Sequence, residues 1–180
     1  MGKATQDLKK EHEAILYVLK IMEKMISSNN RDDSIKLQYG KEVIYFLKIF
    51  ADKCHHGKEE NFLFAELIRY GIPNEGGPIR VMLKEHTQGR EYISLMNKSL
   101  DSEDLLSFKI NAEKYCDLLR AHIAKENNVL FVMADQKLDE AKQEELYKQF
   151  EQHEENVIGH GVHEELHSMI HKWSKEFEVH

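Results

Sequence analysis

The sequence predicts an all-α protein, and three observations lead to this fold class. Apolar residues recur at helical spacing, every three or four positions, over most of the 180-residue chain. Only two prolines and nine glycines interrupt it. The segments rich in turn residues, such as SSNNRDD and YGIPNEGGPI, fall between the periodic stretches. Long helices with short connections favour an up-down-up-down four-helix bundle, here with an additional C-terminal fifth helix.

The first two helices are defined by their apolar stripes. The first is expected over residues 5–28, where Leu8, Ile15 and Leu19 share one face. The polar SSNNRDD stretch then breaks the pattern. Ser34 is a residue type that caps helices, and a second, unusually long helix is predicted from there to YGIPNEGGPI.

The third and fourth helices follow from proline and from a capping sequence. Pro78 can occupy the first turn of a third helix, whose apolar face includes Met82 and Ile93. The DSED sequence at Asp101 resembles a helix start, and the fourth helix is expected to run from there to about Ala134.

The C-terminal segment predicts one further helical stretch. Apolar residues continue at helical spacing over residues 140–177, and Gly159 and Gly161 indicate a kink or a close packing contact. We therefore expect a bundle over residues 1–135 and a helical extension over residues 136–180 that packs on it, together forming a single domain.

The composition excludes several classes of partner. A formal net charge of −7 predicts neither a nucleic-acid partner nor a membrane partner, because both attract clustered lysine and arginine. The N-terminus lacks the apolar core of a signal peptide, so a cytoplasmic location is expected. Cys54 and Cys116 are far apart in sequence and are interpreted as reduced packing residues. Whether the chain is a monomer or a homo-oligomer stays open.

Two HxxxE motifs carry the chemistry. In an α-helix, residues four apart face the same way, so a histidine and a carboxylate at this spacing can bind one metal site. The motif occurs in FADKCHHGKEENFLF and in LRAHIAKENNVLF. Each match alone is weak, because the chain has 11 histidines and 32 acidic residues. The positions of His12, His86 and His122 within apolar stripes strengthen the interpretation, since all three are expected to point inward.

The second helix offers two overlapping pairs, His55 with Glu59 and His56 with Glu60. Seven positions before and after His56 stand an isoleucine and a leucine, whereas the same steps from His55 reach a lysine and a phenylalanine. The apolar stripe therefore favours His56 and Glu60 as the inward pair and leaves His55 at the rim.

Each of the four helices thus sends one histidine inward, and two of them add a carboxylate. Buried groups of this kind must be paired or bound to metal, which predicts a dinuclear site. Imidazole and bridging carboxylate ligands favour two non-haem iron ions over manganese or zinc. The predicted ligands are His12, His56, Glu60, His86, His122 and Glu126.

At these residues the chain resembles the hemerythrin HHE cation-binding family. The resemblance covers at least residues 5–135 and is carried by KEHEAILYVL, HHGKEENFLF, GIPNEGGPIRVMLKEHTQGREY and HIAKENNVLF. It implies that His12 and His56 bind one iron and that His86 and His122 bind the other. It also implies that Glu60 and Glu126 bridge the two irons.

The chain departs from the oxygen-carrying members at one position. They have a second histidine four residues after the third-helix histidine, where this chain has Arg90, beside Gly89. A substitute for the missing histidine ligand is expected from the C-terminal GHGVHEELHSMIH segment, where His163, or alternatively His167, could complete the metal shell.

The leading functional hypothesis is a protein that binds oxygen, nitric oxide or peroxide as a carrier, scavenger or sensor. One alternative is a di-iron redox enzyme that reduces peroxide or nitric oxide or oxidises ferrous iron, with Tyr92 or Tyr115 as a redox-active neighbour. Others are iron storage, delivery or iron-sulfur repair, and a purely structural bundle. Binding is favoured over dedicated catalysis.

Overall fold

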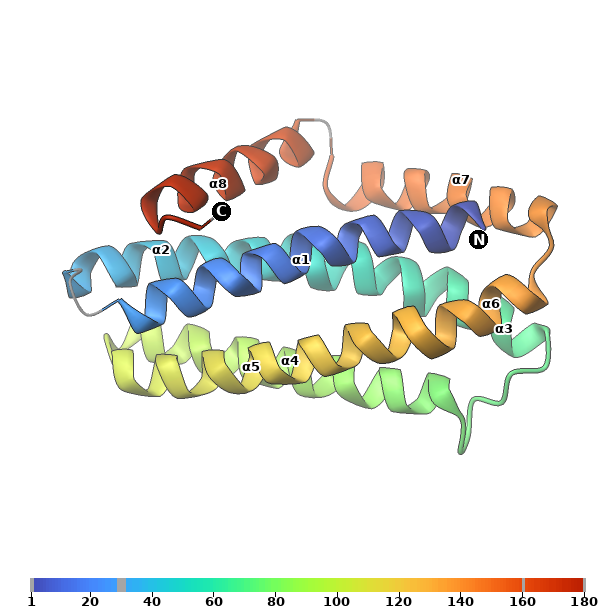
Figure 1. Ribbon diagram of the computed structural model, residues 1–180, viewed down its shortest axis with the longest axis horizontal. Helices are drawn as coiled ribbons and strands as arrows, with labels where there is room; N and C mark the ends of the chain where they lie inside the picture. The colour runs from blue at the N-terminus through green and yellow to red at the C-terminus, as the bar shows by residue number, and fades with distance from the viewer. Residues whose placement is uncertain (1, 29–31, 160, 180) are drawn as a thin grey trace.

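The regular structure of the chain is helical (Figure 1). The computed structural model describes residues 2–28, 32–159 and 161–179, except for the side chain of His163, and within these ranges every regular element is a helix. The prediction of an all-α protein is confirmed. Among these residues, no helix combines the length and the apolar character needed to cross a membrane.

Four long helical rods form the body of the structure. The first and third rods are single helices, α1 (Lys3–Ser27) and α4 (Pro78–Asp101). The second rod joins α2 (Asp33–Phe46), the π-helical segments η1 (Leu47–His56) and η2 (Glu59–Leu63), and α3 (Phe64–Arg69). The fourth joins α5 (Leu105–Lys125), the π-helical η3 (Glu126–Leu130) and α6 (Phe131–Lys137). Consecutive rods run in opposite directions in Figure 1.

Aspartates begin three of the helices. The side chains of Asp32, Asp104 and Asp139 each accept a hydrogen bond of 2.8–3.1 Å from a backbone N–H two or three residues later. Ser34, which was expected to cap the second rod, instead donates its backbone N–H to Asp32. The fourth rod begins after Asp104 rather than near Asp101, because α4 continues to Asp101.

The C-terminal segment forms two separate helices, α7 (Glu140–Val157) and α8 (Val162–Glu176), instead of one kinked stretch. The break contains Gly159 and Gly161, whose φ angles of +79° and +87° are left-handed and favour glycine. α7 packs against α1 and the π-helical part of the second rod, and α8 packs against α1 and α2 (Figure 1).

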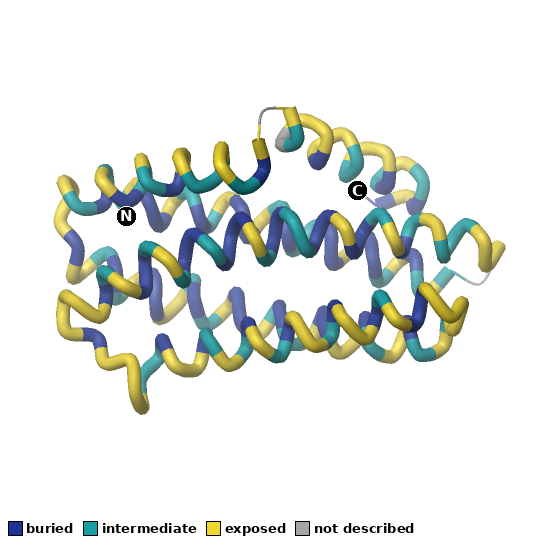
Figure 2. The backbone as a smooth tube through the Cα atoms, turned by 180° about the vertical axis from the view of Figure 1, so that it is seen from behind, coloured by how far each residue is buried: buried dark blue, intermediate teal, exposed yellow. Residues whose placement is uncertain are grey.

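The buried residues lie mainly on the sides of the helices that face one another (Figure 2). They form two apolar clusters rather than one continuous core. On α1, Leu8 belongs to one cluster and Ile15 to the other, and the buried His12 stands between them. Polar residues therefore separate the two halves of the core.

Candidate metal centre

Seven side chains from the four rods meet between the two apolar clusters. They are five histidines and two glutamates, and each keeps at most 4% of its surface exposed. α1 and α4 contribute one residue each, the second rod three and the fourth rod two. The seven are His12, His55, His56, Glu59, His86, His122 and Glu126.

These residues form two groups that share a glutamate. The His55 group consists of His12, His55, Glu59 and Glu126, and the His56 group consists of His56, Glu59, His86 and His122. Within each group the candidate ligand atoms lie within 4.8 Å of one another. This spacing allows one metal ion to be held by each group.

Glu59 lies between the two groups. Its Oε1 is 3.5 Å from Nε2 of His55, and its Oε2 is 3.4 Å from Nε2 of His86. Each carboxylate oxygen thus faces an imidazole of a different group. This is the arrangement that a bridging carboxylate requires.

Glu126 occupies a similar position from the fourth rod. Its Oε2 is 3.2 Å from Nε2 of His12 and 3.1 Å from Nε2 of His122, one imidazole from each group. Its other oxygen is 4.0 Å from Nε2 of His86. Both carboxylates are therefore shared between the two halves of the centre.

The innermost atoms of the centre lack hydrogen-bond partners within the described structure. These atoms are both carboxylate oxygens of Glu59 and of Glu126, and Nε2 of His12 and of His55. Leaving buried polar atoms unpaired is costly, and most native structures avoid it. Metal cations would provide the missing partners, so the residues fit a metal site made of imidazole and carboxylate ligands.

An outer ring of oxygen atoms orients the five imidazoles. Each Nδ1 lies within 3.4 Å of a side-chain oxygen, while the Nε2 atoms of four of the rings face Glu59 or Glu126. Hydrogen bonds of this kind fix the ring orientation of metal-binding histidines. The pairs are His12 with Asn127, His55 with Glu11, His56 with Asp52, His86 with Glu60, and His122 with Glu85.

Arg90 joins two members of this outer ring. Its Nε donates to Asp52 Oδ1 at 2.8 Å, and its Nη2 donates to Glu60 Oε1 at 2.7 Å. Those carboxylates in turn hold His56 and His86. The residue that stands where the resemblance led us to expect a histidine therefore positions two candidate ligands of the His56 group.

Local changes of helical winding bring the glutamates to the centre. Glu59 is the first residue of η2, Glu126 is the first residue of η3, and η1 ends at His56. A π-helix has i→i+5 hydrogen bonds and more residues per turn than an α-helix, so side chains change direction across it. Such segments are rare in proteins and occur often at functional sites.

Burial and mutual charge shift the protonation of the centre. Burial, with the charge of Glu126, raises the pKa of Glu59 to about 7. Burial, with the neighbouring His86, lowers the pKa of His56 to about 4. Burial is the largest single influence on His122 and opposes its protonation, but the charges of Glu126 and Glu59 and the hydrogen bonds to Glu126 and Glu85 together raise its pKa to about 10. Metal ions would displace protons from these groups, because ligands bind metal in their deprotonated form.

The structure brings five of the expected residues together and places a sixth elsewhere. The five are His12, His56, His86, His122 and Glu126. Glu60 was expected to point inward, but its side chain is 26% exposed and bonds to His86 and Arg90 instead. Glu59 takes the inward place. Steps of seven residues assume α-helical winding, and the π-helical segments of the second rod break that register.

His55 is a second correction. It was expected at the rim, yet it is 1% exposed and belongs to the group that contains His12. His56 was expected to share a metal ion with His12, but it is grouped with His86 and His122. The doubled sequence HHGKEE, in which two HxxxE motifs overlap, was the signal that both histidines could take part.

The expected contribution of the C-terminal segment is not seen among the described residues. The side chain of His163 lies outside them, so its contact with metal stays a prediction. His167 is exposed and belongs to neither group. Among the described residues, the fifth imidazole of the centre belongs to His55.

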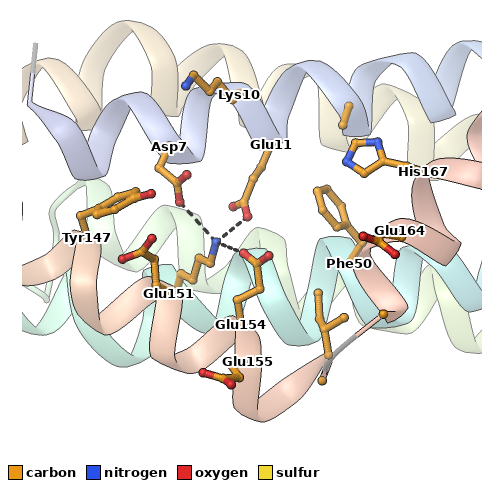
Figure 3. Close-up of a pocket in the computed structure, with 15 residues that line it drawn as sticks. Asp7, Lys10, Glu11, Phe50, Tyr147, Glu151, Glu154, Glu155, Glu164 and His167 are labelled. Atoms are coloured by element: carbon orange, nitrogen blue, oxygen red, sulfur yellow. Dashed lines mark hydrogen bonds and ion pairs between the residues drawn. The ribbon is translucent and has the colours of Figure 1, made fainter.

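A cluster of three carboxylates around the buried Lys58 lies beneath α7 (Figure 3). The Lys58 ammonium group is 1% exposed and lies 2.6 Å from Glu11, 2.9 Å from Glu154 and 3.3 Å from Asp7. Glu11 also bonds to His55. A surface cavity of about 890 Å³ ends at this cluster, and none of the seven centre residues is among the described residues that line it.

The comparisons with known proteins agree with this geometry. The family model described as the hemerythrin HHE cation binding domain matches residues 3–134, which include all seven residues of the centre. No curated protein and no solved structure matches the chain. The matched region covers the four rods up to α6 and most of the chain. In the matched region, a bundle of helices surrounds two groups of histidines and glutamates that could hold cations. The chain belongs to the hemerythrin HHE cation-binding domain family.

Proposed function

We propose that the protein is a non-haem di-iron protein in which the His55 group and the His56 group each hold one iron. Glu59 and Glu126 would bridge the two ions. The observation that carries this proposal is the set of unpartnered carboxylate oxygens and imidazole nitrogens at the centre. Imidazole and carboxylate without thiolate suit iron, while manganese and zinc accept similar ligands.

The function that this site supports best is binding of a small diatomic molecule or oxidant, such as oxygen, nitric oxide or peroxide. The protein would act as a carrier, scavenger or sensor. When bound, the two irons would supply an open coordination position and electrons for such a ligand. The chain itself orients the imidazoles through the outer oxygen ring, and the two apolar clusters shield the centre from water at its two ends.

Anaerobic iron reconstitution followed by metal analysis and optical titration tests the proposal. We expect about two irons per chain and a visible charge-transfer band that shifts on addition of azide or oxygen. Glu126→Gln should lower the iron content, whereas Glu113→Gln, on the exposed side of α5, should not. Protein that takes up no iron would refute the proposal. An unchanged spectrum in His163→Ala would exclude that histidine from the centre.

A redox enzyme that reduces peroxide or nitric oxide is the second candidate. It is favoured by a cavity beside His56, which is larger than a diatomic ligand needs. A stable, reversible oxygen adduct would support binding, while rapid multiple turnover of peroxide or nitric oxide would support the enzyme.

A further inference from the structure

A second cavity opens on the other side of the centre, between the second rod and α4. Its volume is about 540 Å³, and its lining includes His56, Gly89 and Tyr115, all of which are buried. His56 belongs to the candidate metal centre, so the inner end of this cavity touches the centre. The cavity beneath α7, in contrast, ends at the Lys58 cluster (Figure 3).

The size and walls of this cavity suit an organic molecule. A water molecule occupies about 30 Å³ in the liquid, so a diatomic ligand would fill only a small part of the space. Small-molecule sites commonly have volumes of about 300–1,000 Å³ and mostly apolar walls. Here Ile49, Ile93 and the ring of Tyr115 provide apolar surface.

The mouth of the cavity is positively charged. Lys48 is half-buried, Lys53 and Lys98 are exposed, and all three line the cavity. Among the residues that the structure describes, none of these three lysines forms an ion pair, and Lys48 donates only to an asparagine. The cavity also contains Arg90 and Asp52, but these two are paired at 2.8 Å and largely neutralise each other. A surplus of positive charge therefore remains at the mouth.

We propose that this cavity binds a small organic acid with an apolar body. The lysines hold the carboxylate at the mouth, and the apolar end lies beside His56, Gly89 and Tyr115. The inference deepens the proposed function by naming a ligand class for the same site, and it rests on that function only for the iron beside the inner end.

Calorimetric titration of the full chain with butanoate, hexanoate, octanoate and decanoate tests the proposal. The iron content is measured first, and both iron-loaded and chelator-treated protein are titrated. Binding should tighten about fourfold for each added CH₂ that becomes buried. The matched alcohols and amines should bind at least tenfold more weakly, because they lack the negative charge.

Two sets of variants locate the binding site. Replacing Lys48, Lys53 and Lys98 with glutamine should weaken octanoate binding at least tenfold, whereas the same charge change at Lys137, Lys148 and Lys175, on other helices, should not. Gly89→Ala should retain binding, because its Cβ would lie 3.7 Å from Tyr115 Cε2, an ordinary contact. Gly89→Leu should abolish it by filling the cavity, and thermal unfolding checks that the variant is folded.

The outcomes separate this inference from the proposed function. Equal affinity for acids and alcohols, no dependence on chain length, or full binding by Gly89→Leu would overturn the organic-acid site. Iron-loaded protein that binds no acid refutes only this inference. Protein that binds the acids but takes up no iron refutes only the di-iron function.

Discussion

Glu59 and Glu60 are neighbours in the sequence but differ in their place in the structure, so glutamine substitutions at the two positions form a matched test. Glu59 is fully buried with two unpartnered oxygens, whereas Glu60 bonds to His86 and Arg90. We expect Glu59→Gln to prevent binding of the iron pair. Glu60→Gln should weaken iron binding about 10–100-fold, as is typical for residues that orient a ligand.

The two substitutions should change the stability of the metal-free protein in opposite directions. The pKa of Glu59 is about 7 in the folded protein and 4.5 when unperturbed, a difference worth about 3 kcal/mol. Stability is therefore lost as the pH rises from 4.5 to 7, because the unfolded chain ionises first. Glutamine cannot ionise, so Glu59→Gln should raise the free energy of unfolding at pH 8 by about 3 kcal/mol. The pKa of Glu60 is lowered by His86 and Arg90 although partial burial opposes it, so Glu60→Gln should lower stability.

Urea unfolding of chelator-treated protein at pH 8 and pH 4, with metal analysis of the reconstituted variants, measures both effects. The gain from Glu59→Gln should largely disappear at pH 4, where the carboxyl group is protonated in both states. A Glu59→Gln variant that retains two irons, beside a Glu60→Gln variant that retains none, would refute the assignment.

Three further substitutions test the surroundings of the centre. Arg90→Leu should weaken binding of one of the two irons roughly tenfold in a chelator competition, because Arg90 holds outer-ring carboxylates of one group only; equal loss of both irons would contradict this. Lys58→Met should lower the free energy of unfolding in urea by about 3 kcal/mol, because it removes the buried cation that Glu11 and the partly buried Asp7 and Glu154 share; an unchanged midpoint would count against the ion cluster. Trp173, the only tryptophan, donates to Glu42, and that bond and a neighbouring lysine lower the pKa of Glu42 despite partial burial. The resulting stabilisation is present above pH 4.5 and is lost as the pH falls through the lowered pKa of Glu42. Trp173 emission should therefore shift to the red in acid, and in Glu42→Gln the same shift should be present already at neutral pH. Identical emission from both proteins across this pH range would disprove the link.

The helical rods could be predicted because each one must bury an apolar stripe. A 3.6-residue period, ended by turn residues, is enough to locate α1, α4 and most of the other rods. The separation of α7 from α8 was less visible. Two glycines permit a kink, a packing contact or a break, and only their left-handed φ angles in the folded chain distinguish these outcomes.

The candidate site could be predicted wherever the helix stays regular. His12, His86 and His122 lie in α-helical segments, and extrapolation from their apolar neighbours gave the correct face. Extrapolation failed at Glu60, inside the π-helical η2, although it placed His56 and Glu126 inward at the ends of two other π-helical segments. Winding of this kind depends on i→i+5 hydrogen bonds and on packing against other rods, neither of which is visible in the residue pattern.

The π-helical winding also explains how the centre contains five imidazoles although Arg90 stands where a further histidine was expected. Consecutive residues of a regular α-helix do not share a face, so His55 and His56 would not both be expected to point inward. At the end of η1 they do, and they join different groups, with Glu59 shared between them. The His56 group then has three imidazoles and the His55 group two.

The unequal division of imidazoles would make the two irons of the proposed function different from each other. With both carboxylates shared, an iron in the His55 group would have one protein ligand fewer, so an open coordination position would lie in that half. The same half is closed on its α7 side by Lys58 and Glu11, whereas the lysine-rimmed cavity reaches the other half at His56. A diatomic ligand is small enough to pass between packed side chains during their fluctuations, but an organic acid is not. The two ligand classes would therefore be separated by size, with the small oxidant at the His55 group and the acid beside the His56 group.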